Sequence, residues 1–372
     1  MRNLLVTGGA GFIGGNFVHY WLREHVDERL VVLDALTYAG NMATIGGLES
    51  TGRLTFVHGD IADADLVSRV MDEHDIDTIV HFAAESHVDR SIVEPGSFVR
   101  TNVVGTQVLL DAARRAWRPT DSWRSGVRFH HVSTDEVYGS LEPTDPPFTE
   151  RTPYSPNSPY AASKAASDHL VRAYHHTYGL PATISNCSNN YGPYQFPEKL
   201  IPLMIVNALS AKPLPVYGDG KQVRDWLFVE DHCVAIDRIL RADVTGHTFN
   251  VGGRAEHENV YIVRQLCDLI DARMKADANL RTRFPECPGA RNASCGELVT
   301  HVRDRPGHDR RYAIDPSAIA SALRFEPRET LRTGLARTVA WYLENEDWWR
   351  GVMDGSYRQW IARQYGGESA LR

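Results

Sequence analysis

Thr7-Gly8-Gly9-Ala10-Gly11-Phe12-Ile13-Gly14 joins a short β-prone run to the first helical pattern of the chain. Gly9, Gly11 and Gly14 satisfy the pattern G-x-G-x-x-G, and Gly8, Gly11 and Gly14 also give G-x-x-G-x-x-G. In both readings, glycine permits a tight turn and lets the backbone approach a pyrophosphate, whose charge then faces a helix N-terminus. A glycine turn without a ligand is the alternative. The position between a predicted strand and a predicted helix favours a dinucleotide site.

Acidic residues follow this turn at suitable distances. Asp34 ends the second predicted strand, 20 residues after Gly14. A carboxylate there accepts hydrogen bonds from the adenosine ribose hydroxyls and repels a 2′-phosphate, so the sequence predicts NAD in preference to NADP. Asp60, after the third predicted strand, is a candidate for the adenine amino group, with an exposed loop aspartate as the alternative.

Predicted strands and helices alternate along the first half of the chain. The strands are predicted at 4–7, 30–34, 54–58, 78–82, 128–133 and 182–186, and the helices at 12–25, 65–73, 97–116 and 160–178. This alternation predicts an α/β fold with a doubly wound parallel sheet of the Rossmann type and a smaller C-terminal lobe. Further along, we predict a strand end and helix at 228–240, a helix at 260–273 and a surface loop at 277–297.

These patterns suggest a division of the chain into units. An NAD-binding domain is expected over 1–187, with returning segments at about 223–253 and 311–337. A substrate-binding lobe is expected over 188–222 and 254–310. A helical tail is expected over 338–372, where Trp341, Trp348, Trp349 and Trp360 would pack a terminal helix onto the body.

Composition argues against several classes of protein. The 372 residues carry a net charge of −7, whereas general nucleic-acid binding selects a basic face. No apolar run approaches the roughly 20 residues of a membrane helix, and no signal peptide is expected. The five cysteines form no C-x-x-C and are expected to be free thiols of a cytoplasmic protein. Cys287 and Cys295 could bridge or hold a metal, but no matching ligand pair supports a metal site.

Tyr160 and Lys164 form Y-x-x-x-K, which places both side chains on one face of a predicted helix. The Lys cation is predicted to lower the pKa of the phenol toward neutrality. A phenolate can take the proton of a sugar hydroxyl while hydride leaves the same carbon. The pattern alone is common by chance, but its place downstream of the glycine turn and the strand at 128–133 favours a catalytic role.

Thr134, Asp135 and Glu136 follow that strand, at the end where open α/β sheets carry their catalytic groups. Thr134 can hydrogen-bond a sugar hydroxyl. In a partly dry pocket the two neighbouring acids can hold different pKa values, so that one donates a proton while the other accepts one. On this chemistry alone, a solvated acidic turn or helix cap remains an equal alternative.

Several stretches resemble the extended short-chain dehydrogenase/reductase family and, within it, the dTDP-glucose 4,6-dehydratases. They are DALTYAGN (34–41), AAESHVDRS (83–91), TDE (134–136), NNYGPYQ (189–195), PEKL (197–200), GDG (218–220), RDW (224–226) and DRPGHD (304–309). Related 4-epimerases typically carry Ser or Thr and no Asp-Glu pair before Val-Tyr-Gly, so Asp135-Glu136 discriminates between them. Ala35 stands where family members often have Lys, and the stretch 277–297 is longer than usual.

The resemblance implies conversion of dTDP-glucose to dTDP-4-keto-6-deoxyglucose and water, with NAD as an internal hydride shuttle. Tyr160 would take the carbon 4 hydroxyl proton, Glu136 the carbon 5 proton, and Asp135 would protonate the departing carbon 6 hydroxyl. Implied NAD contacts are Gly8, Gly11, Phe12, Ile13, Gly14, Asp34, Thr37, Asp60, Ile61, Ala83, Ala84, Ser86, Tyr160 and Lys164. Implied substrate contacts are Ser86, Thr134, Asn190, Lys199, Leu200, Asn259, His301 and Arg224, whose fork suits a phosphate.

The helices predicted at 97–116 and 160–178 resemble the pair that forms a four-helix dimer interface in this family, which implies a homodimer. Three other functions stay open on the sequence: a sugar-nucleotide 4-epimerase, a 4,6-dehydratase for a CDP- or GDP-sugar, and a non-catalytic NAD-binding module. Tyr160, Lys164, Asp135 and Glu136 together argue against the last of these.

Overall fold

The largest sheet has seven parallel strands, in the order β10-β6-β5-β4-β1-β2-β3. The computed structural model describes residues 2–304 and 307–353. The strands are β1 (Asn3–Thr7), β2 (Arg29–Asp34), β3 (Leu54–His58), β4 (Thr78–His81), β5 (Arg128–Thr134), β6 (Ala182–Cys187) and β10 (Thr248–Val251). The chain runs outward from β1 to β3 and then places β4 on the other side of β1, which opens a crevice at the carboxyl ends of β1 and β4. The predicted doubly wound sheet is confirmed.

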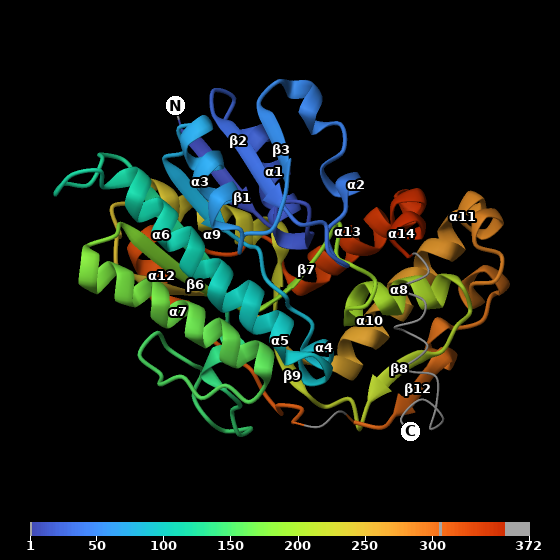
Figure 1. Ribbon diagram of the computed structural model, residues 1–372. Helices are drawn as coiled ribbons and strands as arrows, with labels where there is room; N and C mark the ends of the chain where they lie inside the picture. The colour runs from blue at the N-terminus through green and yellow to red at the C-terminus, as the bar shows by residue number, and fades with distance from the viewer. Residues whose placement is uncertain (1, 305–306, 354–372) are drawn as a thin grey trace.

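Helices cover both faces of this sheet. One face carries α1 (Phe12–Glu24), α9 (Val229–Arg241) and α12 (Ser317–Leu323), and the other carries α3 (Ala64–Glu73), α6 (Thr106–Trp117) and α7 (Pro159–Tyr178). Leu4 and Val6 belong to the core under the first set, and Leu5 belongs to the core under the second. Burial on both faces explains why the strands read as continuous apolar runs. Figure 1 shows α6 and α7 side by side.

The stretch predicted as one helix over 97–116 has a more complex form. α4 (Val88–Val93) and α5 (Pro95–Phe98) lead into a π-helical segment, η2 (Val99–Gly105), which continues as α6. The hydroxyls of Thr106 and Ser167 both donate to the backbone carbonyl of Asn102 inside this wider segment. The prediction of a single regular helix is therefore corrected. A hydrophobic period does not reveal where a helix widens to i→i+5 bonding.

The smaller lobe combines short sheets with helices around its own core. β7 (Asn189–Tyr191), β9 (Val223–Phe228) and β11 (Glu256–Glu258) form one sheet, and β8 (Leu214–Tyr217) pairs in parallel with β12 (Val299–Val302). The helices are α8 (Leu200–Leu209), α10 (Asn259–Ala276), α13 (Leu331–Glu344) and α14 (Glu346–Val352). Their core lies beside the large sheet, at the right of Figure 1. Two short elements, α2 (Met42–Ile45) and η1 (Leu48–Thr51), lie between β2 and β3.

The described tryptophans of the C-terminal region pack against this lobe. Trp349 is 1% exposed, and the ring centres of Trp341 and Trp348 are 5.2 Å apart. Trp360 lies outside the described residues. Within the described ranges, no helix has both the length and the apolar character needed to cross a bilayer.

The stretch 277–297, predicted as a surface loop, folds onto α10 instead. It contains α11 (Ala278–Arg283), η4 (Pro288–Arg291) and the start of η5 (Cys295–Leu298). Phe284, Cys287 and Cys295 are buried in the core of the smaller lobe. The prediction is wrong because abundant Arg, Asn, Pro and Gly conceal a few widely spaced buried side chains. All five cysteines are free and buried.

Candidate active site

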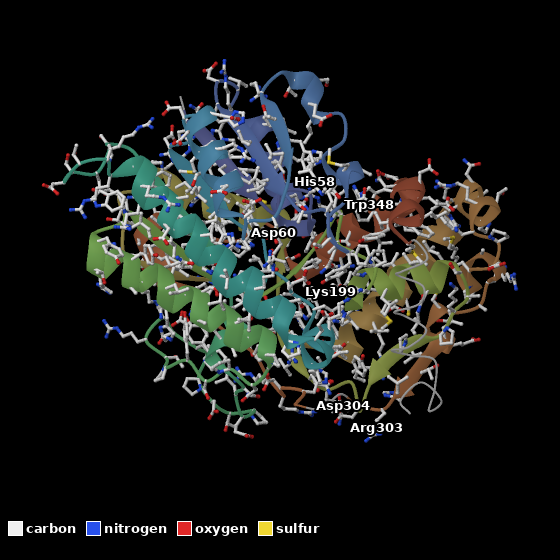
Figure 2. All side chains as sticks on the ribbon, in the orientation of Figure 1. His58, Asp60, Lys199, Arg303, Asp304 and Trp348 are labelled. Atoms are coloured by element: carbon white, nitrogen blue, oxygen red, sulfur yellow. The ribbon has the colours of Figure 1, made fainter. Side chains whose placement is uncertain are left out.

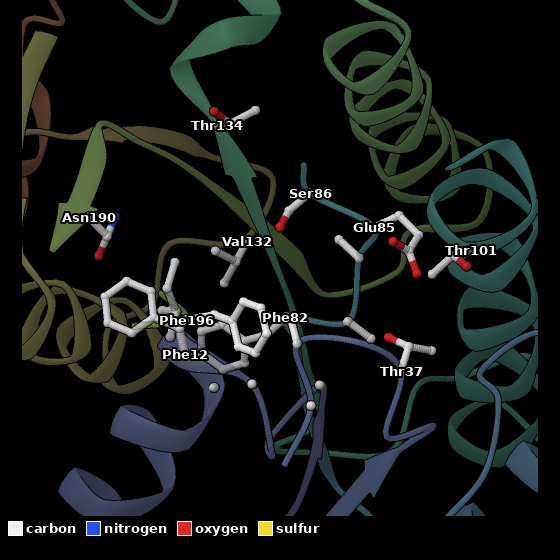
Figure 3. Close-up of a pocket in the computed structure, with 18 of the residues that line it drawn as sticks. Phe12, Thr37, Phe82, Glu85, Ser86, Thr101, Val132, Thr134, Asn190 and Phe196 are labelled. Carbon is white, nitrogen blue, oxygen red and sulfur yellow. The ribbon is translucent and has the colours of Figure 1, made fainter. Parts of the chain in front are cut away.

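One cavity of about 340 Å³ runs along the carboxyl ends of β1, β2, β4 and β5 and continues against the segment between β6 and α8. Most of the predicted site residues line it: Gly8, Gly11, Phe12, Ile13, Gly14, Asp34, Thr37, Asp60, Ile61, Ala83, Ala84, Ser86, Thr134, Asp135, Glu136, Tyr160, Lys164, Asn190 and Lys199. Figure 3 shows Thr134, Ser86 and Asn190 around the same space as the Phe12 ring. Leu200, Arg224, Asn259 and His301 are outside this lining.

At Gly8 and Gly14, the glycine turn packs too closely against backbone atoms for a side chain to fit. Gly8 has a φ of +71°, and a Cβ on it would lie 2.6 Å from the backbone nitrogen of Ala83. A Cβ on Gly14 would lie 2.3 Å from the carbonyl oxygen of Gly8. Among the described residues, no side chain caps the N-terminus of α1 at Gly11. An anion such as a dinucleotide pyrophosphate would supply the missing acceptor, so the turn fits NAD.

Asp34 at the end of β2 and Asp60 just after β3 lie on one side of the cavity, which we call the β2–β3 side. The two carboxylate oxygens of Asp34 accept backbone hydrogen bonds, from Ala10 at 2.9 Å and from Leu36 at 2.8 Å. Burial raises the pKa of Asp34, and these hydrogen bonds oppose that rise. Asp60 is half-buried and forms an ion pair with Arg100 at 3.0 Å. Both carboxylates are therefore held in fixed positions.

α7 brings Tyr160 and Lys164 to the opposite, β5 side of the cavity. The hydroxyl of Ser158 caps this helix and Pro159 occupies its first turn, which fixes where the helix begins. The Lys164 ammonium donates to the carbonyl of Val132 at 2.8 Å. Burial lowers the pKa of Lys164 to about 8, and the charge of Asp168 opposes the shift.

The pKa of Tyr160 moves opposite to the direction predicted from the sequence. Burial, followed by the charge of Glu136, raises the pKa of Tyr160 well above its ordinary value. The Lys164 ammonium is directed to the Val132 carbonyl and does not compensate for this desolvation. The spacing Y-x-x-x-K locates both residues correctly, but it does not report how deeply they are buried.

A buried polar cluster behind Lys164 was not predicted. His131 Nε2 lies 3.3 Å from Lys164 Nζ and 3.2 Å from a carboxylate oxygen of Asp168. The other Asp168 oxygen accepts hydrogen bonds from Ser133 at 2.9 Å and from Tyr154 at 2.8 Å. Burial lowers the pKa of His131, so this ring is neutral at pH 7. The available signal was Asp168, which stands one helical turn after Lys164.

The Thr134–Glu136 stretch turns from β5 into a single 3₁₀ turn, η3 (Asp135–Tyr138). The Thr134 hydroxyl accepts from the backbone N–H of Glu136 at 3.3 Å, which holds the turn. Asp135 is 1% exposed, and its Oδ2 has no hydrogen-bond partner among the described residues. Burial, followed by the Glu136 charge, raises the pKa of Asp135 well above the ordinary carboxyl range. Burial thus favours the protonated form of Asp135, while Glu136 is half-buried at the cavity wall.

Asn190 and Lys199 bring the smaller lobe to this cavity. The amide of Asn190 donates to the carbonyl of Ser188 at 2.9 Å. The Lys199 ammonium donates to the carbonyl of Ser86 at 3.1 Å and so bridges the two lobes near the middle of the molecule in Figure 2. Leu200 follows directly as the first residue of α8.

Three predicted substrate contacts lie in the smaller lobe, outside this lining: Arg224 on β9, Asn259 at the start of α10 and His301 on β12. The Arg224 guanidinium donates to the carbonyls of Val223 and Asp309, at 2.7 and 2.9 Å, and lies 4.1 Å from the centre of the Tyr312 ring. Its charge reaches the β5 side, where it lowers the pKa of Asp135 against the effect of burial. His301 is exposed and lies 2.8 Å from the Gly218 carbonyl.

Several further residues line the cavity that the sequence had not singled out, among them Tyr38, Glu85, Cys187, Phe196 and Glu198. Glu198 is 5% exposed and lies 3.2 Å from the Arg90 guanidinium. Its signal was present, because Glu198 stands inside PEKL (197–200), next to Lys199.

Proteins of known family with similar sequences are 4,6-dehydratases of nucleotide sugars. The family described as GDP-mannose 4,6 dehydratase matches residues 5–338. A dTDP-glucose 4,6-dehydratase of Xanthomonas campestris pv. campestris (strain B100) is 56% identical over 360 residues, or 96% of this chain and 98% of the relative. The chain belongs to the dTDP-glucose 4,6-dehydratase family. The resemblance drawn from the sequence motifs is thereby confirmed.

Solved structures of this family superimpose along almost the whole chain. The Streptomyces venezuelae dTDP-glucose 4,6-dehydratase, solved with NAD and a second ligand, gives a TM-score of 0.82 at 46% identity, covering 94% of this chain and all of that one. The Bacillus anthracis dTDP-glucose 4,6-dehydratase, in complex with NAD, gives 0.81 at 42% identity, covering 95% and 100%.

Proposed function

We propose that the protein is a lyase that converts dTDP-glucose to dTDP-4-keto-6-deoxyglucose and water. The observation that carries the proposal is the acid pair at the end of β5. Asp135 is buried and its pKa is raised, Glu136 is half-buried beside it, and both line the cavity that holds Tyr160 and Lys164. Oxidation at carbon 4 alone would require only the Tyr and Lys pair. Elimination of water also requires a proton donor and a proton acceptor side by side.

NAD is the cofactor that the residues of this cavity suit. The turn at Gly8 and Gly14 would hold the pyrophosphate, and Asp34 and Asp60 would hold the adenosine. Thr37, Ile61, Ala83, Ala84 and Ser86 complete the wall. Bound NAD would accept the hydrogen of carbon 4 with its electron pair and return it to carbon 6.

Tyr160 and Lys164 would carry the oxidation. Lys164 supplies a positive charge in the cavity, and Thr134 is placed to hydrogen-bond a sugar hydroxyl. Burial raises the pKa of Tyr160, so the positive charges of Lys164 and of bound NAD would have to favour its phenolate, which would then accept the proton of the carbon 4 hydroxyl. The resulting carbonyl acidifies the proton on carbon 5.

Asp135 and Glu136 would carry the elimination. Burial raises the pKa of Asp135 and so favours its protonated form, which would donate a proton to the leaving hydroxyl of carbon 6. Glu136 would accept the proton of carbon 5. The contrast in burial between two adjacent carboxyl groups is what lets one act as acid and the other as base.

The smaller lobe would hold the nucleotide diphosphate. The Arg224 guanidinium is already oriented by two carbonyls and by the Tyr312 ring, and its planar fork matches phosphate oxygens. The buried Asn259 Oδ1 has no hydrogen-bond partner among the described residues, which suits a ligand donor. Asn190, Lys199, Leu200 and His301 would complete the subsite.

The protein would act as a homodimer. Ile92 and Val93 on α4, with Val99 and Val104 on η2, are 46, 77, 52 and 43% exposed. This apolar group lies on the layer formed with α6 and α7. A second copy would cover it, and sedimentation at micromolar concentration measures the expected doubling of mass. Five buried free thiols suit a reducing compartment, which supports placing the protein in the cytoplasm.

Incubation of the protein with dTDP-glucose, followed by mass spectrometry, should show a product lighter by one water. Glu136→Gln keeps the size of the side chain but cannot accept a proton, so water loss should slow by about 10²–10⁴-fold. Exchange of the carbon 5 proton with deuterated solvent should fall in parallel. Wild-type water loss in this variant would show that Glu136 is not the base. An isomer of unchanged mass from wild-type protein would identify an epimerase instead.

A further inference from the structure

Two cysteine sulfurs lie next to each other in the segment that follows α11 and packs on α10. α11 lies at the right edge of Figure 1. The Sγ atoms of Cys287 and Cys295 are 3.6 Å apart, and both side chains are fully buried. Buried cysteines often serve only as small apolar side chains, as isolated Cys233 does in the other core. A pair of thiols in contact has a chemistry that isolated thiols lack.

The two thiols have different surroundings. Cys287 stands at the N-cap of η4. The Cys295 thiol and the backbone N–H groups of Gly289 and Ala290 all lower the pKa of Cys287. The pKa of Cys295 is raised by Cys287 and by burial. Cys287 is thus the sulfur that ionises more easily of the two, and the thiolate is the reactive form of cysteine.

The surrounding structure holds the pair together and keeps it near solvent. The Asp271 carboxylate on α10 accepts hydrogen bonds from the Cys295 backbone N–H at 3.1 Å and from the Ser294 hydroxyl at 3.1 Å. The residues between η4 and η5, from Asn292 to Ser294, are exposed. A small opening of this exposed connection would admit a small oxidant. Metal binding is not favoured, because the described residues contain no group of three or more metal-ligating side chains.

We propose that Cys287 and Cys295 form a site of reversible two-electron oxidation by hydroperoxides. The Cys287 thiolate attacks one oxygen of hydrogen peroxide, which breaks the O–O bond and gives a sulfenic acid and hydroxide. The Cys295 sulfur then attacks the Cys287 sulfur, forms the S–S bond and releases the second oxygen as water. Two thiols and one peroxide thus give one disulfide and two waters, with two electrons passing from the sulfurs to the peroxide oxygens.

The disulfide would restrict the motion of η5, the segment that leads into β12. η5 begins at Cys295 and leads directly into β12, the strand that carries His301. A covalent link from Cys295 to Cys287 would fix this entry against η4 and α10. Amide hydrogen exchange over 295–302 should therefore slow in the oxidised protein. This consequence does not depend on the proposed dehydratase activity.

Trypsin makes the oxidation easy to detect. Cleavage after Arg283, Arg291 and Arg303 places Cys287 in peptide 284–291 and Cys295 in peptide 292–303. After treatment of the native full-length protein with hydrogen peroxide and alkylation of remaining thiols, the two peptides should appear covalently joined. Their mass should be two hydrogens below the sum, and dithiothreitol should separate them. Two alkylated peptides at a peroxide dose that oxidises the partly exposed Met42 and Met353 would overturn the proposal.

Variants test the order of attack. In Cys295→Ser, the Cys287 sulfenic acid should persist and react with dimedone, whereas in Cys287→Ser the Cys295 thiol should stay unmodified. Cys267→Ser is the matched control, because Cys267 is buried in the same core and should leave the linked peptides unchanged. Dimedone labelling of Cys295 in place of Cys287 would reverse the assignment of the attacking sulfur. The wild-type peptide result stands even where a variant fails to fold.

Discussion

The two sides of the cavity hold aspartates in opposite conditions. On the β2–β3 side, both oxygens of Asp34 are bonded to backbone N–H groups and Asp60 is paired with Arg100. On the β5 side, Asp135 is buried with an oxygen that no described residue bonds. The first side is internally satisfied and so defines fixed positions. On the second side, a buried carboxyl oxygen has no hydrogen-bond partner among the described residues until a ligand binds. Burying such an oxygen lowers the stability of the fold and shifts the pKa of the carboxyl group. The contrast separates groups suited to binding from groups suited to proton transfer.

Tyr160→Phe should give the largest effect of any change on the β5 side. The ring stays in place, but the oxygen that would accept the hydroxyl proton is lost. Turnover should fall by at least about 10²–10⁴-fold, the range for a positioned general base. Single-turnover measurement with substrate deuterated at carbon 4 follows the step directly. Tyr178→Phe, at a 36% exposed position, is the control and should change nothing. A normal rate of hydrogen transfer in Tyr160→Phe would remove Tyr160 from the oxidation.

Asp135→Asn should lower turnover by about 10²-fold and raise stability at the same time. The folded protein binds the Asp135 proton more tightly than the unfolded chain does, because the folded pKa is raised. Wild-type stability therefore declines as pH rises from the ordinary carboxyl range toward that raised pKa. Asn lacks this decline. Thermal unfolding of both proteins across pH should show a gap in Tm that grows with pH in favour of the variant. A gap independent of pH would mean that folding does not raise the pKa of Asp135.

Asp34→Asn tests the β2–β3 side of the cavity, where the effect should be on NAD binding and not on the rate. NAD affinity should fall by about tenfold, since hydrogen bonds to a charged group contribute about 1.5–3 kcal/mol and Asn retains part of them. The rate with saturating NAD should be nearly normal. Asp60→Asn is the matched variant and should lose less affinity, because Asp60 is less buried and its ion pair with Arg100 is exposed. Calorimetric titration with NAD measures both. A larger loss of NAD affinity in Asp60→Asn than in Asp34→Asn would show that Asp60 makes the stronger contact with NAD.

Sequence reasoning succeeded where a short local pattern has a direct structural meaning. The glycine turn, Asp34 and the alternating elements define the large sheet, and the Tyr160–Lys164 and Thr134–Glu136 motifs lie in one cavity as the strand ends require. It failed where contacts between distant segments decide the outcome. The widening at Val99–Gly105, the His131–Asp168 cluster and the fold of 277–297 depend on partners that no local period reveals. The direction of the Tyr160 pKa failed for the same reason, because burial is a property of the assembled structure.

The placement of α9 and α12 has a consequence for the synthesis of the protein. These helices close one face of the large sheet, but α9 begins only at Val229, whereas β2 ends at Asp34. A ribosome adding about 5–20 residues per second needs roughly 10–40 s to travel from the one to the other. During that time α1 covers only part of this face. Apolar side chains such as Val32 cannot yet pack against α9 and α12. The nascent chain therefore exposes an apolar sheet face during much of its synthesis. Chaperones bind exposed apolar surfaces of this kind.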